Sequence, residues 1–517
     1  MQPTSITSSY LTRFEALDRG AGAFDGTPLP VTGAQRRFVL AQRLHPQGRP
    51  TLVPLFFTFP AGTVDPERLH AAAGHLAATH PALRARPLVR RGVPVQVIGT
   101  PAAEVRRVRP RPGEGAADAL LSALGDWPAA GPPLRLFLAA DAETTGAGAG
   151  AAGAGAGAAG TGVETEAGDG GRGREILAIV MDHTVCDEQS LGQIMADLGA
   201  AYRDRLGPRD VSAETLADGV SAYAEAVRLQ LAAEERASAA ASLGYWAERL
   251  AALQPPSDPL PVQGAAPVSS GGPAVTGAAG RRLALGGDAR AAAFPTVLDA
   301  CVSAARTLHG RRSVPALGYP WGGRPAAAPP VLGCFLNTVP HPADDLDRTA
   351  RASVWWDDLD HADAPFDEVV HAARRARVPW SGRLDGLVTF EDLHRRPPLR
   401  LGGVVGREIH LDGRPLQAPF AVSVSYGADL LVRMAWDRAV VPDHRAEDAF
   451  EALVAALGEH GDGAPERRDP APRDDRAAPP SPSPGAAPAP ASGREPDPSD
   501  PRTTAAPLAA AAPTRPN

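Results

Sequence analysis

Apolar and polar positions follow two clear patterns around residue 183. Ile176–Met181 is a continuous apolar run, which predicts a strand that is buried on both faces. From residue 190 onward the apolar positions follow helical spacing, and Ser190 with Gln193 forms an S-x-x-Q capping box that predicts Ser190 as the helix N-cap. Strand, polar turn and helix therefore place His183 and Asp187 on one tight corner, where a rigid scaffold can present reactive groups.

The same two patterns predict mixed α/β structure along the rest of the chain. Pro133–Leu138 is expected to pair with the strand at Glu175–Asp182 across the intervening loop, and 420–426 is expected to form a hairpin with 430–436. The further predicted strands are 52–59, 83–86, 94–98, 282–285, 314–319 and 386–390. The further predicted helices are 65–79, 213–253, 296–309 and 445–457, with one more starting at 365.

Shifts in composition predict two lobes with three segments of little structure around them. Stretches rich in Gly, Ala and Pro cannot bury enough apolar surface to order themselves. We expect a flexible N-terminal leader at 1–28, an N-terminal lobe at 29–253 with a disordered Gly/Ala-rich loop at 141–174, an inter-lobe linker at 254–280, a C-terminal lobe at 281–460, and a disordered Pro/Ala-rich tail at 461–517.

Charge and residue usage exclude several classes of function. The net charge of -7, from 52 basic and 59 acidic residues, gives no support for a nucleic-acid binder. The chain has no lysine, which excludes Schiff-base chemistry and a lysine-containing phosphate loop. Three widely spaced cysteines suit a reducing compartment. The N-terminus lacks a signal-peptide pattern and no apolar run has the length of a membrane span, so we expect a cytoplasmic protein.

His183 and Asp187 form an H-x-x-x-D pentad that has two interpretations. In the functional one, a neutral imidazole accepts a proton from a nucleophile while Asp187 pairs with a distant arginine and fixes the corner. In the structural one, a histidine ends the strand and the helix dipole favours an acid in the first turn. A metal site built on His183, Cys186 and Cys334 lacks a second ligand pair, so we expect no metal and interpret Cys186 as a core residue.

Several blocks, in order along residues 29–460, together resemble the condensation domains of nonribosomal peptide synthetases. The Asp182–Ser190 segment is similar to the family's H-H-x-x-x-D-G-x-S motif. The other blocks are Thr32-Gly-Ala-Gln35-Arg36, which is similar to S-x-A-Q-x-R; Thr79–Arg84, similar to R-H-E-x-L-R; Tyr245-Trp246, similar to Y-W; Gly323-Arg324, similar to G-R; Gly333–Thr338, similar to G-x-F-V-N-T; and Pro365–Glu368, similar to the P-F-E block.

The resemblance implies a fold and a set of partners. Members of this family have two chloramphenicol-acetyltransferase-like lobes of mixed sheets and helices, arranged as a V-shaped pseudo-dimer with a central tunnel. The phosphopantetheine arms of acyl- or peptidyl-carrier proteins enter that tunnel as part of the substrate. We therefore expect carrier proteins and a small amine or alcohol acceptor as partners, no bound cofactor, no nucleic acid, no membrane, and a monomer.

Two positions depart from the family motif. Asp182 replaces its first histidine and Glu188 replaces its glycine, whereas His183 and Asp187 are retained. Asp182 favours a charged imidazolium if it approaches His183 closely, although neighbours on a strand normally point to opposite faces. Glu188 is expected to narrow the acceptor side, to contact a cationic acceptor, or to block the tunnel.

Four other residues are expected to support the site. Ser190 is predicted to cap the helix, and Arg84 and Arg324 are the candidate partners of Asp187. Asn337 either supports the tunnel wall from the second lobe or has a plain structural role.

The resemblance implies acyl transfer without a covalent enzyme intermediate. The expected function is that of a free-standing condensation enzyme, which moves an acyl or aminoacyl group from a carrier thioester to an amine or hydroxyl, with His183 as base or positioning residue. Two alternatives stay open: a catalytically degenerate module that recruits a partner enzyme, and an acyltransferase of the same fold that uses a coenzyme A thioester.

Overall fold

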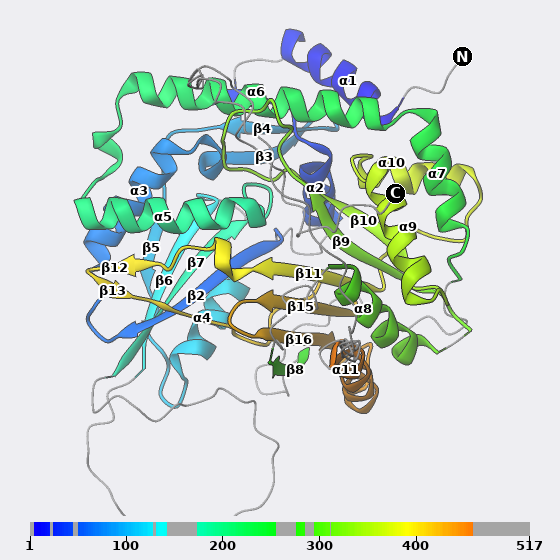
Figure 1. Cartoon of the computed structure of the whole chain (residues 1–517). Helices are drawn as coiled ribbons and strands as arrows, with labels where there is room; N and C mark the ends of the chain where they lie inside the picture. The colour runs from blue at the N-terminus through cyan, green and yellow to red at the C-terminus, as the bar shows by residue number, and fades with distance from the viewer. Residues whose placement is uncertain are drawn as a thin grey trace, which may run out of the picture.

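The computed structural model describes residues 5–20, 24–44, 50–127, 131–141, 173–254, 276–284, 294–310 and 312–458. They form two lobes, each built on its own mixed sheet with helices packed against it (Figure 1). The tail expected at 461–517, nearly all of the loop expected at 141–174, and residues 255–275 of the expected linker lie outside the described residues. In the part of the chain described, no helix is long and apolar enough to cross a membrane.

The N-terminal lobe is organised around a five-stranded sheet. Its strand order is β14-β2-β7-β6-β5, with β14 at Arg407–Ile409, β2 at Leu52–Pro60, β7 at Arg174–Asp182, β6 at Leu134–Ala140 and β5 at Glu104–Arg107. The antiparallel pairing of β6 with β7 confirms the predicted pairing across the loop.

Helices cover both faces of this sheet, which explains the continuous apolar run of β7. Leu177, Ile179 and Met181 point into a core shared with α3 (Pro66–Thr79) and α5 (Glu188–Asp204). Ala178 and Val180 point the other way, into a smaller core under α4 (Ala116–Gly125).

The expected flexible leader at 1–28 is wrong, because residues 6–20 form helix α1 (Ile6–Gly20). Tyr10 and Leu17 share one helical face and are buried in the core of the N-terminal lobe. The Tyr10 hydroxyl accepts a hydrogen bond from Val31 N and donates one to Pro94 O. These contacts with distant segments fix the helix, and its own polar sequence does not predict them.

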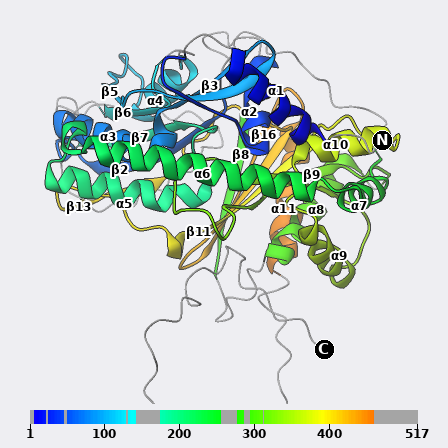
Figure 2. The same ribbon diagram turned by 90° about the horizontal axis from the view of Figure 1, so that it is seen from above.

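The N-terminal half contains several further elements. A three-stranded sheet has the order β1 (Thr27–Leu29), β4 (Val93–Ile98) and β3 (Ala85–Arg90), and β3 follows a 3-10 turn at Pro81–Arg84. Helix α2 spans Gly33–Leu44, a second 3-10 turn spans Pro208–Asp210, and the long helix α6 spans Ala213–Ala237. Helix α6 runs across both lobes (Figure 2), so it ties their cores together.

The C-terminal lobe contains a six-stranded sheet. Its order is β10 (Leu336–Pro342), β9 (Ala316–Gly322), β11 (Gly386–Asp392), β15 (Phe420–Tyr426), β16 (Leu430–Asp437) and β8 (Thr276–Leu283). Strands β15 and β16 form the predicted hairpin. The helices of this lobe are α7 (Ala240–Leu250), α8 (Phe294–His309), α9 (Arg348–Asp360), α10 (Phe366–Arg375) and α11 (Asp443–Gly458).

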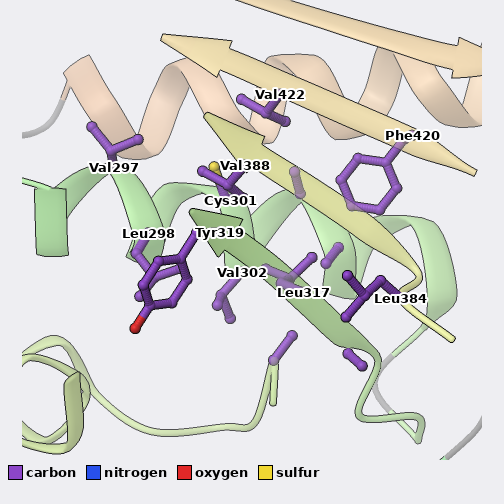
Figure 3. Packing of buried hydrophobic residues seen from close by; sticks show 14 of the residues in the cluster. Val297, Leu298, Cys301, Val302, Leu317, Tyr319, Leu384, Val388, Phe420 and Val422 are labelled. Atoms are coloured by element: carbon purple, nitrogen blue, oxygen red, sulfur yellow. The ribbon is translucent and has the colours of Figure 1, made fainter. Parts of the chain in front are cut away.

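One face of this sheet packs on α8 to form the core shown in Figure 3. Val297, Cys301 and Val302 of α8 meet Leu317 and Val388 of the central strands, all nearly or fully buried. Because alternate strand residues point to opposite faces, residues such as Ser423 and Arg433 face away from α8.

Three expected boundaries are wrong. Helix α7 lies in the C-terminal lobe, where Trp246 and Leu250 are buried, although the N-terminal lobe was expected to extend to residue 253. Strand β8 starts at Thr276, inside the segment expected as linker at 254–280. Its Gly- and Ala-rich sequence has little strand propensity, but β16 pairs with it along its whole length. A Cβ at Gly277 would lie 2.2 Å from the Trp436 ring, so the small residue is required there by packing.

The segment 281–460 is not one lobe, because part of it crosses to the other. A 3-10 turn at Leu393–Arg395 follows β11, and then come β12 (Arg400–Leu401), β13 (Val404–Val405) and β14. Leu399 and Leu401 are buried in the core of the N-terminal lobe, and β14 pairs with β2. The two lobes are therefore joined by a strand exchange as well as by helix α6.

Candidate active site

The strand-to-helix corner forms as the sequence predicts, but its cap is a different residue. Strand β7 ends at Asp182 and α5 begins at Glu188. Asp187 is the N-cap, and its side chain accepts a hydrogen bond from Ser190 N. The predicted capping by Ser190 is wrong, because Asp187 already occupies the capping position and Ser190 is left at the third position of the helix.

His183 is held in one tautomer. Its Nδ1 lies 3.1 Å from Cys186 O, and a carbonyl oxygen only accepts, so Nδ1 carries the proton and donates. In the neutral ring, Nε2 is then a free acceptor with a lone pair. Burial lowers the pKa of His183, and the positive charge of Arg37 lowers it further, against the opposing effects of Asp187 and of the Cys186 carbonyl. The imidazole is therefore neutral near pH 7.

Helix α2 covers the corner with two residues whose role the sequence analysis missed. The Phe38 ring stacks on His183, with ring centroids 4.0 Å apart and planes at 19°. Gln35 Nε2 donates to Thr184 O at 2.8 Å, which fixes the turn from the other side. The signal for both was the Thr32-Gly-Ala-Gln35 block, because Phe38 lies one helical turn after Gln35.

Asp187 is fully buried and binds the C-terminal lobe. Arg324 Nη1 lies 2.9 Å from Asp187 Oδ2 and 3.1 Å from Oδ1, and Phe335 N donates to Oδ2 at 3.0 Å. Ser190 Oγ donates to Oδ1 at 2.8 Å and accepts from Arg324 Nη2. Both oxygens of Asp187 are engaged within the protein, so its side chain ties the corner to Arg324, Phe335 and Ser190.

Three other predicted residues take separate positions. Asp182 turns away from His183: its Oδ1 accepts from the Thr184 backbone N and hydroxyl, and burial raises its pKa. Arg84 lies outside the site, where Nη1 donates to Gly99 O. Asn337 donates to Ala362 O and Ala364 O and accepts from Phe366 N, so it fixes the start of α10.

Of the two candidate partners for Asp187, only Arg324 is confirmed. Arg84 is excluded because its Nε and Nη2 find no partner among the described residues, and burial alone lowers its pKa. The Arg324 guanidinium also donates to Val331 O and lies over the Phe335 ring, 4.8 Å from its centroid. These contacts orient the guanidinium toward Asp187.

Glu188 forms a second ion pair, with an arginine of the segment that crosses between the lobes. Its Oε1 accepts from Arg396 Nη2 at 2.6 Å, and Arg396 Nη1 donates to Glu408 Oε1 at 2.7 Å. Glu391 lies 3.8 Å from the same guanidinium. Burial, set against the attraction of Arg396, raises the pKa of Glu188 to about 7. Nothing in the sequence pointed to Arg396.

The surroundings of the corner contain a narrow pocket and no metal cluster. The pocket lies where α2 and α6 meet β9 and β10, and its walls include Ala34, Glu234, Trp321, Gly323 and Asn337. Among the described residues, no group of His, Cys, Asp and Glu side chains could hold a metal ion. Cys186 is fully buried, as expected of a core residue.

Sequence comparisons leave the family open, because neither a family model nor a curated protein matches this chain. Solved structures do match. The X-domain from teicoplanin biosynthesis has 17% identity and a TM-score of 0.57 over 85% of this chain and 97% of that one. A structure described as CT has 17% identity and a TM-score of 0.51 over 89% and 97%.

A third match is part of a longer protein. The nonribosomal peptide synthetase FmoA3 has 19% identity and a TM-score of 0.56 over 86% of this chain, which spans 43% of the FmoA3 chain. At these identities the likeness establishes the fold. The chain therefore has the mixed α/β, chloramphenicol-acetyltransferase-like fold of the condensation-type domains of nonribosomal peptide synthetases.

Proposed function

We propose that this protein is a condensation enzyme of nonribosomal peptide or related natural-product biosynthesis. It transfers an acyl or aminoacyl group from the phosphopantetheine thioester of a carrier protein to an amine or hydroxyl acceptor. The shared fold and the retained His183 and Asp187 support this proposal. The single observation that carries it is the tautomer of His183, which leaves Nε2 of a neutral imidazole as a hydrogen-bond acceptor.

The mechanism follows from that nitrogen. Nε2 accepts the proton of the acceptor amine or hydroxyl as the nucleophile attacks the thioester carbonyl. A bond from nitrogen or oxygen to carbon forms, the carbon–sulfur bond breaks, and the proton passes to the departing thiolate. Phe38 and the Cys186 carbonyl keep the ring from turning, and binding both substrates between the lobes supplies much of the rate through proximity.

A single-turnover transfer assay tests the proposal. Carrier proteins loaded with acyl groups are mixed with a panel of amines and alcohols, and product is followed by mass spectrometry. We expect His183→Ala to lower the rate roughly 100- to 10,000-fold. His394→Ala is the matched control, because the His394 ring is exposed and its side-chain hydrogen bond goes to Gly427 O rather than to the corner. Equal rates for His183→Ala and the native protein would refute the role of His183.

The Glu188–Arg396 pair favours a second candidate, a module of the same fold that recruits another enzyme. The pair ties the segment that crosses between the lobes to the residue next to Asp187. A domain of this fold, the X-domain from teicoplanin biosynthesis, has been solved in complex with OxyB. No transfer by the native protein or by Glu188→Gly, together with submicromolar binding to an enzyme of the same biosynthesis, would favour this candidate. Transfer that appears only in Glu188→Gly would show that the Glu188–Arg396 ion pair prevents transfer in the native protein.

A further inference from the structure

Tyr223 of helix α6 lies between the two groups of contacts that hold the His183 corner. It is 1% exposed. Its hydroxyl belongs to a buried polar network in the N-terminal lobe, and its ring packs against Phe335, the residue that precedes β10. Helix α6 runs across both lobes (Figure 2), and Tyr223 contacts segments of both. One side chain therefore reaches both sides of the corner.

The hydroxyl of Tyr223 is linked to the corner through Gln35. It donates to Gln96 Oε1 at 2.9 Å and accepts from Gln35 Nε2 at 3.4 Å. Gln35 Nε2 also donates to Thr184 O at 2.8 Å. Gln35 and Gln96 are almost fully buried, so each of these hydrogen bonds is costly to lose. Because Thr184 directly follows His183, the network ends on the peptide group next to the residue that carries the imidazole.

Two backbone groups fix the direction of the hydrogen bonds in this network. Pro30 O can only accept, so the Gln96 atom that lies 2.7 Å from it is the amide nitrogen, and Gln96 Oε1 faces Tyr223. Thr32 N can only donate, so it holds Oε1 of Gln35 at 3.0 Å and leaves Nε2 of Gln35 to face the turn. Burial raises the pKa of Tyr223, so its hydroxyl keeps its proton and remains a donor.

The ring of Tyr223 supports the other end of the corner. It meets the Phe335 ring edge to face, with centroids 6.3 Å apart and planes at 81°. Phe335 N donates to Asp187 Oδ2 at 3.0 Å, so the position of Phe335 bears directly on the N-cap of α5. The fit is close, because a Cβ at Gly333 would lie 3.2 Å from Cε2 of Tyr223. The ring therefore packs against the same short segment that binds Asp187.

We propose that Tyr223 is a positioning residue for His183. Its hydroxyl acts through Gln35 on one end of the turn, and its ring acts through Phe335 on the other end. The effect on the imidazole stands on its own, whereas an effect on the rate of acyl transfer rests on the proposed function. A tyrosine that only filled the core would contribute to stability and leave the imidazole of the folded protein unchanged.

Nitrogen NMR of the full chain, labelled at its histidine nitrogens, tests the proposal without catalysis. The His183 signals are assigned by their absence from the spectrum of His183→Ala. The native protein should show one tautomer of His183, with the proton on Nδ1. In Tyr223→Phe, Gln96 Oε1 loses its hydroxyl donor and Gln35 is oriented less firmly. The Nδ1 and Nε2 signals of His183 should therefore move toward each other, because the second tautomer becomes populated.

The transfer assay adds a readout of rate. Tyr223→Phe should lower the single-turnover rate at saturating acceptor roughly three- to tenfold, as expected for the loss of one hydrogen bond. The acceptor concentration that gives half the maximal rate should not change, because Tyr223 acts on the base and not on acceptor binding. Tyr223→Leu also removes the ring contact with Phe335, so its rate should fall further. The difference between the two variants separates the effect of the hydroxyl from that of the ring.

Tyr202→Phe is the matched control. Tyr202 is also 1% exposed and belongs to the same core as Tyr223. Its hydroxyl accepts from Asp65 N near the C-terminal end of α5, at the opposite end of that helix from Asp187. Tyr202→Phe should therefore lose stability as well, but its His183 signals and its transfer rate should equal those of the native protein.

The outcomes separate the proposal from its alternatives. Native His183 signals in folded Tyr223→Phe would overturn the positioning role, and so would equal shifts of these signals in Tyr223→Phe and Tyr202→Phe. Signals that move only in Tyr223→Phe, in a chain that transfers no acyl group, would support the positioning role while the proposed function fails.

Discussion

Asp187 and Glu188 are adjacent residues, and each pairs with an arginine from the C-terminal half of the chain. Asp187 is fully buried and receives hydrogen bonds from Arg324, Phe335 N and Ser190. Both carboxylate oxygens of Asp187 accept hydrogen bonds from the surrounding protein. Removing any one partner from such a saturated buried network leaves another group without a partner.

The Glu188 pair has the opposite character. Its arginine, Arg396, is shared with Glu408 and lies close to Glu391, so several carboxylates compete for one guanidinium. The Glu188 side chain is 34% exposed, whereas that of Asp187 is fully buried. Burial and carboxylate repulsion keep the pKa of Glu188 near 7, which means that it loses its charge close to neutral pH.

The difference shows that the ion pairs of two adjacent residues have different roles. The Asp187–Arg324 pair fixes the corner that holds His183, and both carboxylate oxygens of Asp187 are already bonded. The Glu188–Arg396 pair is crowded and partly wet, so it can be rearranged at little cost. Asp187, which matches the family motif, fixes the structure of the corner. Glu188, which differs from the motif, forms the ion pair that can rearrange.

The largest effect is expected for Asp187→Asn. The change keeps the shape but leaves the Arg324 charge buried without a carboxylate, and breaking a buried pair in this way costs about 3–5 kcal/mol. Urea denaturation measures the loss. Glu451→Gln is the control. Its ion pair with Arg281 is exposed, so its loss should not measurably change the free energy of unfolding. A loss below about 1 kcal/mol for Asp187→Asn would show that the pair is not saturated as described.

Ser190→Ala should have the next largest effect. Its hydroxyl joins Asp187, Arg324 and Gly333 N, and the alanine leaves that backbone donor buried without its partner. We expect destabilisation of about 1–3 kcal/mol in the same denaturation experiment. Ser221→Ala is the matched control, because its hydroxyl bonds to Ala217 O on the exposed face of α6. Equal midpoints for the two variants would contradict the network.

Local pattern predicted the corner and its retained residues, but not what surrounds them. The apolar run of β7 and the helical spacing of α5 are continuous in sequence, so His183 and Asp187 could be placed together, and Arg324 was named from its block. Arg396 lies 208 positions from Glu188 and belongs to no block. Helix α1 and the first part of strand β8 were missed because they are stabilised by Tyr10 and by pairing with β16, which are contacts between distant segments.

Glu188 should make its own contribution to the pH dependence of stability. Its pKa of about 7 lies above the ordinary 4.5, so between these values the folded protein binds a proton that the unfolded chain has released. This contribution to stability is present at low pH and is lost as pH rises from 4.5 to 7. Glu188→Gln cannot titrate and should lose less stability over that range. If the native protein and Glu188→Gln have identical slopes of unfolding free energy against pH, the raised pKa of Glu188 is contradicted.

The smallest effect is expected for Glu188→Gln on the pH dependence of transfer, because Glu188 and the corner that holds His183 should act independently. Burial lowers the pKa of His183, so the acid limb of kcat/KM for transfer should lie below the ordinary value of 6.5, because protonation of Nε2 removes the base. Glu188 titrates higher, and its charge is already balanced by Arg396. Glu188→Gln should therefore leave the acid limb within about 0.3 pH units, measured as single-turnover rates from pH 5 to 8. A limb that moves with Glu188→Gln would show that the adjustable pair controls the base, and the separation between the Asp187 and Glu188 regions would then fail.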